Sequence, residues 1–220
     1  MLKPFLRGRD VKRWSTNFAD YYLIQIESSE NKQHPWANQT STEAERIFAR
    51  TYPSVHSYFE GFRDKLIKRS DQGRYFWELR SCAYWQEFEQ VQIAWGNLST
   101  KPNFSFVEAG IYLSAPATFM VSDSSYLLGI LNSQVMHYFI SRIAAVRQGG
   151  FLEFKPMYVS QISIPKASSA DQKIISALVQ KCLNAKGQNL TEWEAEINDR
   201  VAHLYGLTAE EIKIIEGEQN

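Results

Sequence analysis

The stretch VQIAWGNLSTKPNFSFVEAGIYLSAPATFMV, residues 91–121, decides the fold class of this chain of 220 residues. Turn-forming residues divide it into short runs rich in β-branched and aromatic side chains, at 91–95, 104–107, 111–113 and 118–121. This spacing predicts a meander or part of a strongly curved sheet. Ser124 and Ser125 then precede a run from Tyr126 to about Ala145 that is apolar on most sides, which predicts a buried helix.

Helices and strands are predicted on both sides of this stretch. Before it, we expect an ordered loop over 2–14, a strand over 21–26, a helix from Thr42 that is interrupted at Tyr52-Pro53, and a second helix over 54–67. After it, we expect strands at 151–154 and 159–164, helices at 171–186 and 191–205, and a short last helix opened by a Thr208–Glu211 capping box. The sequence therefore predicts an α+β fold, in which a curved mixed β-sheet with flanking helices, residues 1–166, precedes a helical C-terminal region, residues 167–220.

The composition excludes several classes of protein. Hydrophobic residues make up 44% of the chain and aromatic residues 14%, which argues against intrinsic disorder. The two cysteines, Cys82 and Cys182, lie far apart in sequence, so neither a disulfide framework nor a four-cysteine zinc site is expected. No apolar run is long enough to predict a transmembrane helix. We therefore expect a cytoplasmic protein without a membrane span.

The charge is unevenly distributed along the chain. Lysine and arginine match aspartate and glutamate overall, at 24 each, but residues 1–166 carry a net charge of +4 and residues 167–220 a net charge of −4. The first fourteen residues alone carry +4. This asymmetry indicates a polyanionic partner for the front of the chain, with a solvated basic surface as the alternative.

Motifs of the common enzyme classes are absent from the sequence. There is no Gly-x-x-x-x-Gly-Lys-Ser/Thr phosphate loop, no glycine-rich dinucleotide or S-adenosylmethionine turn, and no Gly-x-Ser-x-Gly elbow. The four histidines have no metal-ligand spacing. We expect a non-catalytic chain with no metal and no cofactor, although an active site assembled from distant residues stays open.

Basic residues in polar segments are the candidate contacts to a polyanion, because a phosphate needs a lysine, an arginine or a backbone donor. Those of the N-terminal segment surround Gly8, and others follow a helix, a turn or a strand. Lys68 and Arg69 also suit the dipole at the C-terminal end of the second helix, an equally good structural explanation. The candidates are Arg7, Arg9, Lys12, Arg13, Lys68, Arg69, Arg74, Arg147 and Lys155.

A series of short motifs points to a known family. In order they are LKPFLRGRDV (2–11), YLI (22–24), FRDKLIKRSD (62–71), WELR (77–80), YLLGILNS (126–133) and QISIP (161–165). With this order and spacing, the chain resembles the TaqI-like C-terminal specificity domain. That domain follows the adenine-methyltransferase domain in many bacterial type II restriction–modification enzymes.

The resemblance implies a DNA target-recognition domain over residues 1–166, with double-stranded DNA and an upstream methyltransferase domain as partners. The parent enzyme would be a DNA adenine methyltransferase or a restriction endonuclease. Sequence-specific recognition of double-stranded DNA is therefore the predicted function. Two alternatives stay open: a protein–protein interaction module of a larger enzyme with little DNA contact, and a complete small enzyme.

Overall fold

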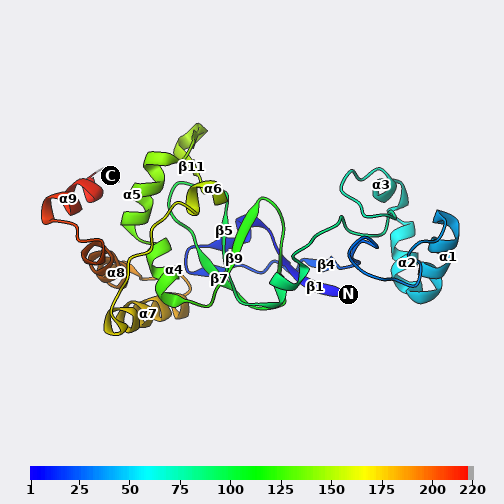
Figure 1. Cartoon of the computed structure of the whole chain (residues 1–220), viewed down its shortest axis with the longest axis horizontal. Helices are drawn as coiled ribbons and strands as arrows, with labels where there is room; N and C mark the ends of the chain where they lie inside the picture. The colour runs from blue at the N-terminus through cyan, green and yellow to red at the C-terminus, as the bar shows by residue number, and fades with distance from the viewer. Residues whose placement is uncertain (218–220) are drawn as a thin grey trace. The chain divides into compact units, whose positions relative to one another are not determined.

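The chain, described over residues 1–217 by a computed structural model, divides into two compact units (Figure 1). The smaller unit comprises Met1–Lys3 and Tyr22–Glu87, and the larger unit comprises Pro4–Tyr21 and everything from Phe88 onward. Most of the smaller unit is therefore inserted into the sequence of the larger one. Helices combined with several small sheets confirm the α+β class.

A three-stranded antiparallel sheet lies at the centre of the larger unit. Its middle strand β5 (Gln92–Gly96) pairs with β7 (Ser105–Val107) and β9 (Ala117–Val121). All five residues of β5 are buried. Ile93 and Trp95 join one hydrophobic cluster while Ala94 joins another, because side chains alternate between the two faces of a strand. Hydrophobic residues therefore cover both faces of the sheet.

The strand predicted at 111–113 pairs outside this sheet. It forms β8 (Tyr112–Leu113), which runs parallel to β1 (Leu2–Leu6) through the pairs Phe5–Tyr112 and Leu6–Leu113. The prediction of a loop over 2–14 is wrong at this point, since β1 and the short hairpin of β2 (Val11–Lys12) and β3 (Ser15–Thr16) occupy it. Charge and proline concealed the strand, which pairs with residues about a hundred positions away in sequence.

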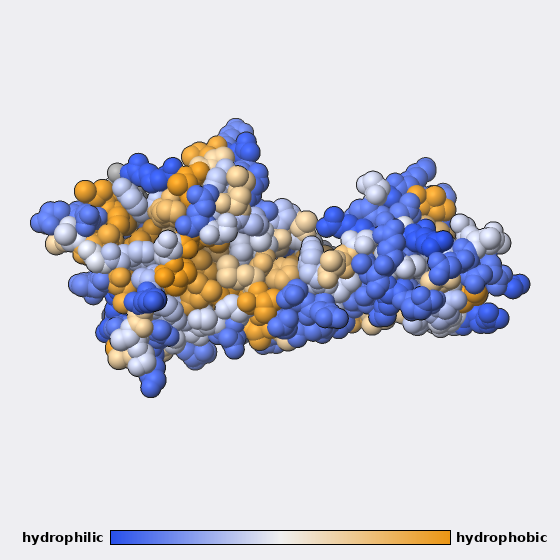
Figure 2. Space-filling view, in the orientation of Figure 1, coloured by the Kyte–Doolittle hydropathy of each residue, from blue (hydrophilic) through white to orange (hydrophobic). Residues whose placement is uncertain are grey.

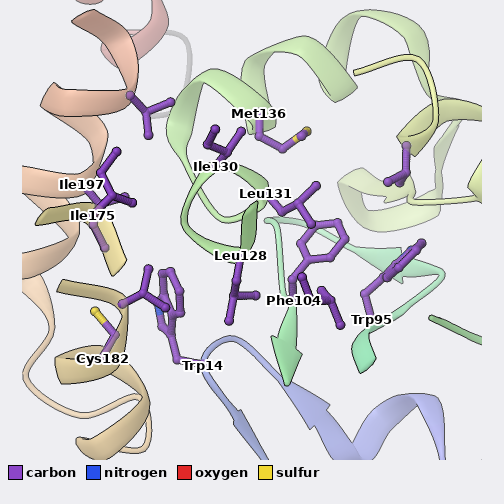
Figure 3. Packing of buried hydrophobic residues seen from close by; sticks show 14 of the residues in the cluster. Trp14, Trp95, Phe104, Leu128, Ile130, Leu131, Met136, Ile175, Cys182 and Ile197 are labelled. Atoms are coloured by element: carbon purple, nitrogen blue, oxygen red, sulfur yellow. The ribbon is translucent and has the colours of Figure 1, made fainter. Parts of the chain in front are cut away.

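Helices cover the face of the central β7–β5–β9 sheet that carries Ile93 and Trp95, and Figure 3 shows this core. Trp14 from the β2–β3 hairpin and Phe104 from the segment before β7 meet Leu128 from α4 (Ser125–Leu131), Cys182 from α7 (Ser169–Asn184) and Ile197 from α8 (Thr191–Leu204). Gly129 lets α4 and α7 approach closely, because a Cβ there would lie 2.8 Å from a methyl carbon of Ile175. The helices of the C-terminal region thus share their core with the sheet.

One long helix was predicted over 126–145, and two helices occur instead. α4 ends before Asn132, whose side chain accepts from the backbone N–H of Phe104 and donates to its carbonyl, at 3.0 and 2.9 Å. Ser133 then caps α5 (Gln134–Ile143) by accepting from Met136 N–H. The bonds between Asn132 and Phe104, the residue before β7, fix the break at this position.

The chain after α5 forms a small antiparallel sheet and then a helical turn. β10 (Val146–Arg147) pairs with β11 (Phe151–Glu153), and β11 pairs with β6 (Leu98–Ser99). The strand predicted at 159–164 is wrong, because α6 (Pro156–Val159) begins at a proline in the first helical position and no strand follows it within the described residues. The last helix, α9 (Ala209–Gly217), has the predicted capping box. Of the predicted region 167–220, residues 218–220 lie outside the described residues.

The smaller unit contains β4 (Tyr22–Ile24), α1 (Ser41–Thr51), α2 (Pro53–Glu60) and α3 (Arg63–Ile67), so the helix predicted over 54–67 is divided at Gly61-Phe62. Its core is an aromatic stack in which Trp77 lies between Phe48 and Tyr75, each 4.9 Å away between ring centres. The buried carboxylate of Glu78 accepts hydrogen bonds from the Trp36 indole and from Ser29. Because these groups satisfy it, the carboxylate can stay buried.

A helix long and apolar enough to cross a membrane is absent from the described part of the chain.

Candidate nucleic-acid interface

The larger unit has a groove of about 870 Å³ between its N-terminal segment, the segment that follows β5, and β11. We call it the cationic groove. The following residues line it: Arg7, Gly8, Arg9, Val11, Lys12, Gly96, Asn97, Leu98, Ser99, Thr100, Asn103, Ser114, Ala115, Pro116, Phe151, Glu153 and Lys155. Gly96 lets two of these segments meet, because a Cβ at this position would lie 3.2 Å from the Gly8 carbonyl oxygen. Four of the nine predicted contact residues therefore lie around one groove.

Arg9 and Lys12 are the exposed cations of the N-terminal wall. Neither side chain forms an ion pair within the residues that the structure describes. A cation that is not held in an ion pair keeps its N–H donors available for a phosphate. These two residues are therefore the strongest of the predicted contacts in the larger unit.

Arg7 lies in the same wall but already has a partner. Its guanidinium binds both oxygens of the buried Asp10 carboxylate, each at 2.8 Å, and lies over the Tyr21 ring. The hydrogen bonds from Arg7 lower the pKa of Asp10 below its ordinary value. Arg7 thus holds the 3-10 turn Gly8–Asp10 that presents Arg9, and a DNA contact of its own stays a prediction.

The opposite wall of the groove includes an ion triad. Glu153, whose side chain is only 7% exposed, binds Arg147 through one oxygen, at 2.6 Å from Nε and 2.5 Å from Nη2, and Lys155 through the other, at 2.7 Å. Hydrogen bonds from Lys155 and Arg147 lower the pKa of Glu153, which keeps the carboxylate charged. The side chains of Arg147 and Lys155 are about half exposed, at 57% and 45%. Both predicted cations thus face solvent while one carboxylate fixes them.

Hydrophobic side chains accompany this triad. Phe151, Val146 and Met157 are exposed, and Figure 2 shows hydrophobic surface among hydrophilic residues at the end of the larger unit that carries β11 and α6. Exposed aromatic groups beside cations suit a partner with both charge and flat apolar surfaces.

Arg13 has a different environment from its neighbour Lys12. It binds Glu194 of α8 and donates to the Pro102 carbonyl at 3.1 Å. The side chain is 27% exposed. This arrangement ties the N-terminal segment to the C-terminal helices, and a phosphate contact by Arg13 stays a prediction.

The remaining predicted contacts belong to the smaller unit. Lys68 is exposed at the C-terminal end of α3, and Arg74 is exposed and donates to Asn38 at 3.0 Å. Arg69 instead donates to the backbone carbonyls of Phe76 and Glu78, which gives it a structural role in this unit. Lys68 and Arg74 are therefore the better candidates there.

Sequence reasoning missed the polar lining of the groove and Glu153. Asn97, Ser99, Thr100 and Asn103 come from the segment between β5 and β7 that contains β6, and the side-chain oxygen of Asn103 is buried without a hydrogen-bond partner. Amide and hydroxyl groups of this kind can bind base edges. Glu153 was detectable in principle, since it lies two residues before Lys155 in a predicted strand, but its pairing with Arg147 depends on the hairpin register.

One group of side chains in the smaller unit has metal-ligand proximity. Ligand atoms of Glu45, His56 and Glu60 lie within 4.8 Å of one another. Arg63, however, binds both carboxylates, and its hydrogen bond lowers the pKa of Glu45. Because one guanidinium already binds both carboxylates, the group is explained as an ion-pair network.

Comparison with known proteins agrees with this architecture. A search of curated proteins found no match. Among solved structures, the chain is similar to the type IIL restriction–modification enzyme MmeI in complex with DNA, with a TM-score of 0.64 and 11% sequence identity. The similarity covers 98% of this chain but 31% of the MmeI chain, and at this identity it shows the fold alone.

The family comparison is more specific. The model of the TaqI-like C-terminal specificity domain matches residues 3–164, which covers both the inserted smaller unit and the cationic groove. The chain therefore belongs to the family of TaqI-like C-terminal specificity domains.

Proposed function

We propose that this chain recognises a specific sequence in double-stranded DNA and supplies target specificity to a restriction–modification enzyme. The observation that carries the proposal is the cationic groove, where Arg9 and Lys12 face solvent without an ion pair among residues 1–217 and Lys155 lies on the opposite wall. Cations supply affinity for the phosphate backbone, and the amide and hydroxyl groups between them are suited to base edges.

We further infer that the chain is non-catalytic and that an upstream methyltransferase domain of the parent protein carries the chemistry. The chain spans about a third of the length of the MmeI chain, which supports a role as one part of a larger enzyme. Family membership supports the same division of labour.

Titration of labelled duplex DNA at two or more salt concentrations tests the proposal. Away from its target, the chain should bind with a Kd of about 10⁻⁴–10⁻⁶ M at physiological salt. If Arg9, Lys12 and Lys155 each neutralise one phosphate, the slope of log K against log salt should be about −2.7. Binding that does not respond to salt, or no binding at low salt, would contradict the proposal and favour a protein–protein interaction module.

A further inference from the structure

The hairpin of β10 and β11 carries a fixed arginine at its exposed end. Arg147 and Phe151 are opposite each other in the hairpin, and Glu153 is opposite Leu98 of β6. Residues opposite each other, and residues two apart in a strand, share one face of a sheet. Arg147, Phe151, Glu153 and Leu98 therefore lie on one face, and the last three of them line the cationic groove.

Glu153 uses only one edge of the Arg147 guanidinium. Its oxygen Oε1 accepts a hydrogen bond from Nε and lies 2.5 Å from Nη2 in an ion pair, and these two nitrogens form the side edge of the planar group. A guanidinium has five N–H donors in a fixed fork, so the edge formed by Nη1 and the outer Nη2 hydrogen stays available. No other hydrogen bond of this side chain occurs within the described residues. Arg147 thus presents two parallel donors in a plane that Glu153 fixes.

Two parallel donors match the two acceptors of guanine in the major groove, O6 and N7. A two-stranded β-ribbon also fits the width of the major groove, and the Arg147–Phe151 pair lies beyond the residues of β11 that pair with β6. At the tip of this hairpin, Gly149 and Gly150 have positive φ angles of 80° and 76° and carry no side chains, so the ribbon can approach a base closely. Phe151 adds an exposed aromatic surface next to Arg147, which suits a base edge better than a phosphate.

We propose that Arg147 recognises one guanine of the target sequence and that Glu153 is the residue that positions it. This assignment rests on the proposed function, DNA recognition, and names guanine as the base that this wall of the groove selects. With Lys155 held by the other oxygen of Glu153, the triad has two positive charges and one negative charge, so Glu153 does not repel the DNA.

Selection of bound sequences from a pool of randomised duplexes tests the proposal on the full chain. The wild type should enrich a motif that contains guanine, and R147A should lose the preference at one guanine position by about 5- to 150-fold while other positions keep theirs. R147K should not restore the preference, since an ammonium cannot form the paired contact. E153Q should weaken discrimination at the same position while overall affinity is kept or increased.

K12A is the matched control, since it removes one cation from the same groove. It should weaken binding to all sequences alike and leave the motif intact. Thermal melting of each variant separates misfolding from lost recognition, and Arg147 is exposed enough for its replacements to fold. A motif unchanged in R147A, or a uniform loss that R147K rescues, would overturn the guanine assignment and leave the proposed function standing. No motif in the wild type would overturn both.

Discussion

Trp14 donates its indole N–H to the carboxylate of Glu194 at 2.6 Å, across 180 residues of sequence. Arg13 donates to the same oxygen, so two adjacent residues of the N-terminal segment depend on one side chain of α8. Trp14 is almost completely buried, at 1% exposure. The acidic C-terminal region therefore stabilises the segment that presents Lys12 to the groove.

Replacement of Glu194 by alanine should lower the free energy of unfolding of the larger unit by about 1–3 kcal/mol, because it leaves a buried indole N–H without an acceptor. Urea denaturation followed by tryptophan fluorescence measures the loss. E192A is the matched control, since Glu192 is exposed on the same helix and should have little effect. Equal stability of the two variants would show that Glu194 is dispensable.

Truncation after Pro165 should prevent the larger unit from folding. Ile175, Val179 and Val201 are completely buried in the core that α7 and α8 share with α4, and removing them exposes its apolar surface. Circular dichroism and a cooperative melting transition check this. A truncated chain that folds and binds DNA, but no longer associates with the methyltransferase part, would instead assign the region to assembly.

Although they are two residues apart, Arg7 should contribute to folding stability and Arg9 to DNA binding. R7A should lower the melting temperature, because it leaves the buried carboxylate of Asp10 without its cation. R9A should keep the melting temperature and reduce the salt slope of DNA binding by about 0.9. Thermal melting and DNA titration of both variants check this assignment. A lower melting temperature of R9A would contradict it, and so would weaker DNA binding by R7A without a change in stability.

Acid should weaken the larger unit through Asp10. Its pKa is lowered in the folded chain by Arg7, so the carboxylate contributes stability above its unfolded pKa of about 3.9, and this contribution is lost as the pH falls toward the lower folded value. D10N lacks this contribution at every pH. The difference in unfolding free energy between wild type and D10N should therefore shrink below about pH 4, and a constant difference down to pH 2 would contradict the role of the ion pair.

Local signals in the sequence were sufficient for several elements. The Thr208–Glu211 capping box and the interruption at Pro53 depend on residues within one helical turn, and both occur as predicted. The division of the helix at Asn132 depends on Phe104, 28 residues away, and no helical pattern contains that information. β1 was missed for the same reason, since it pairs with β8, about a hundred residues away in sequence.

The candidate site, too, could be predicted from the sequence only in part. Composition was sufficient to name the cations. Only the folded chain separates Arg7 and Arg13, which form ion pairs, from Arg9 and Lys12, which form none within the described part of the chain. Glu153 could not be selected from the sequence, because its importance arises from the register that places it beside Arg147.

The nested order of the two units has a consequence for engineering. The segment Tyr22–Glu87 is inserted into the sequence of the larger unit, so both of its ends continue into that unit. It forms all of the smaller unit except Met1–Lys3, and it contains the whole aromatic core of that unit. Such a segment can be exchanged as a cassette between relatives without creating new chain ends. Chimeras with junctions at Tyr21/Tyr22 and Glu87/Phe88 would keep the groove and the helical core of one parent while taking Lys68 and Arg74 from another.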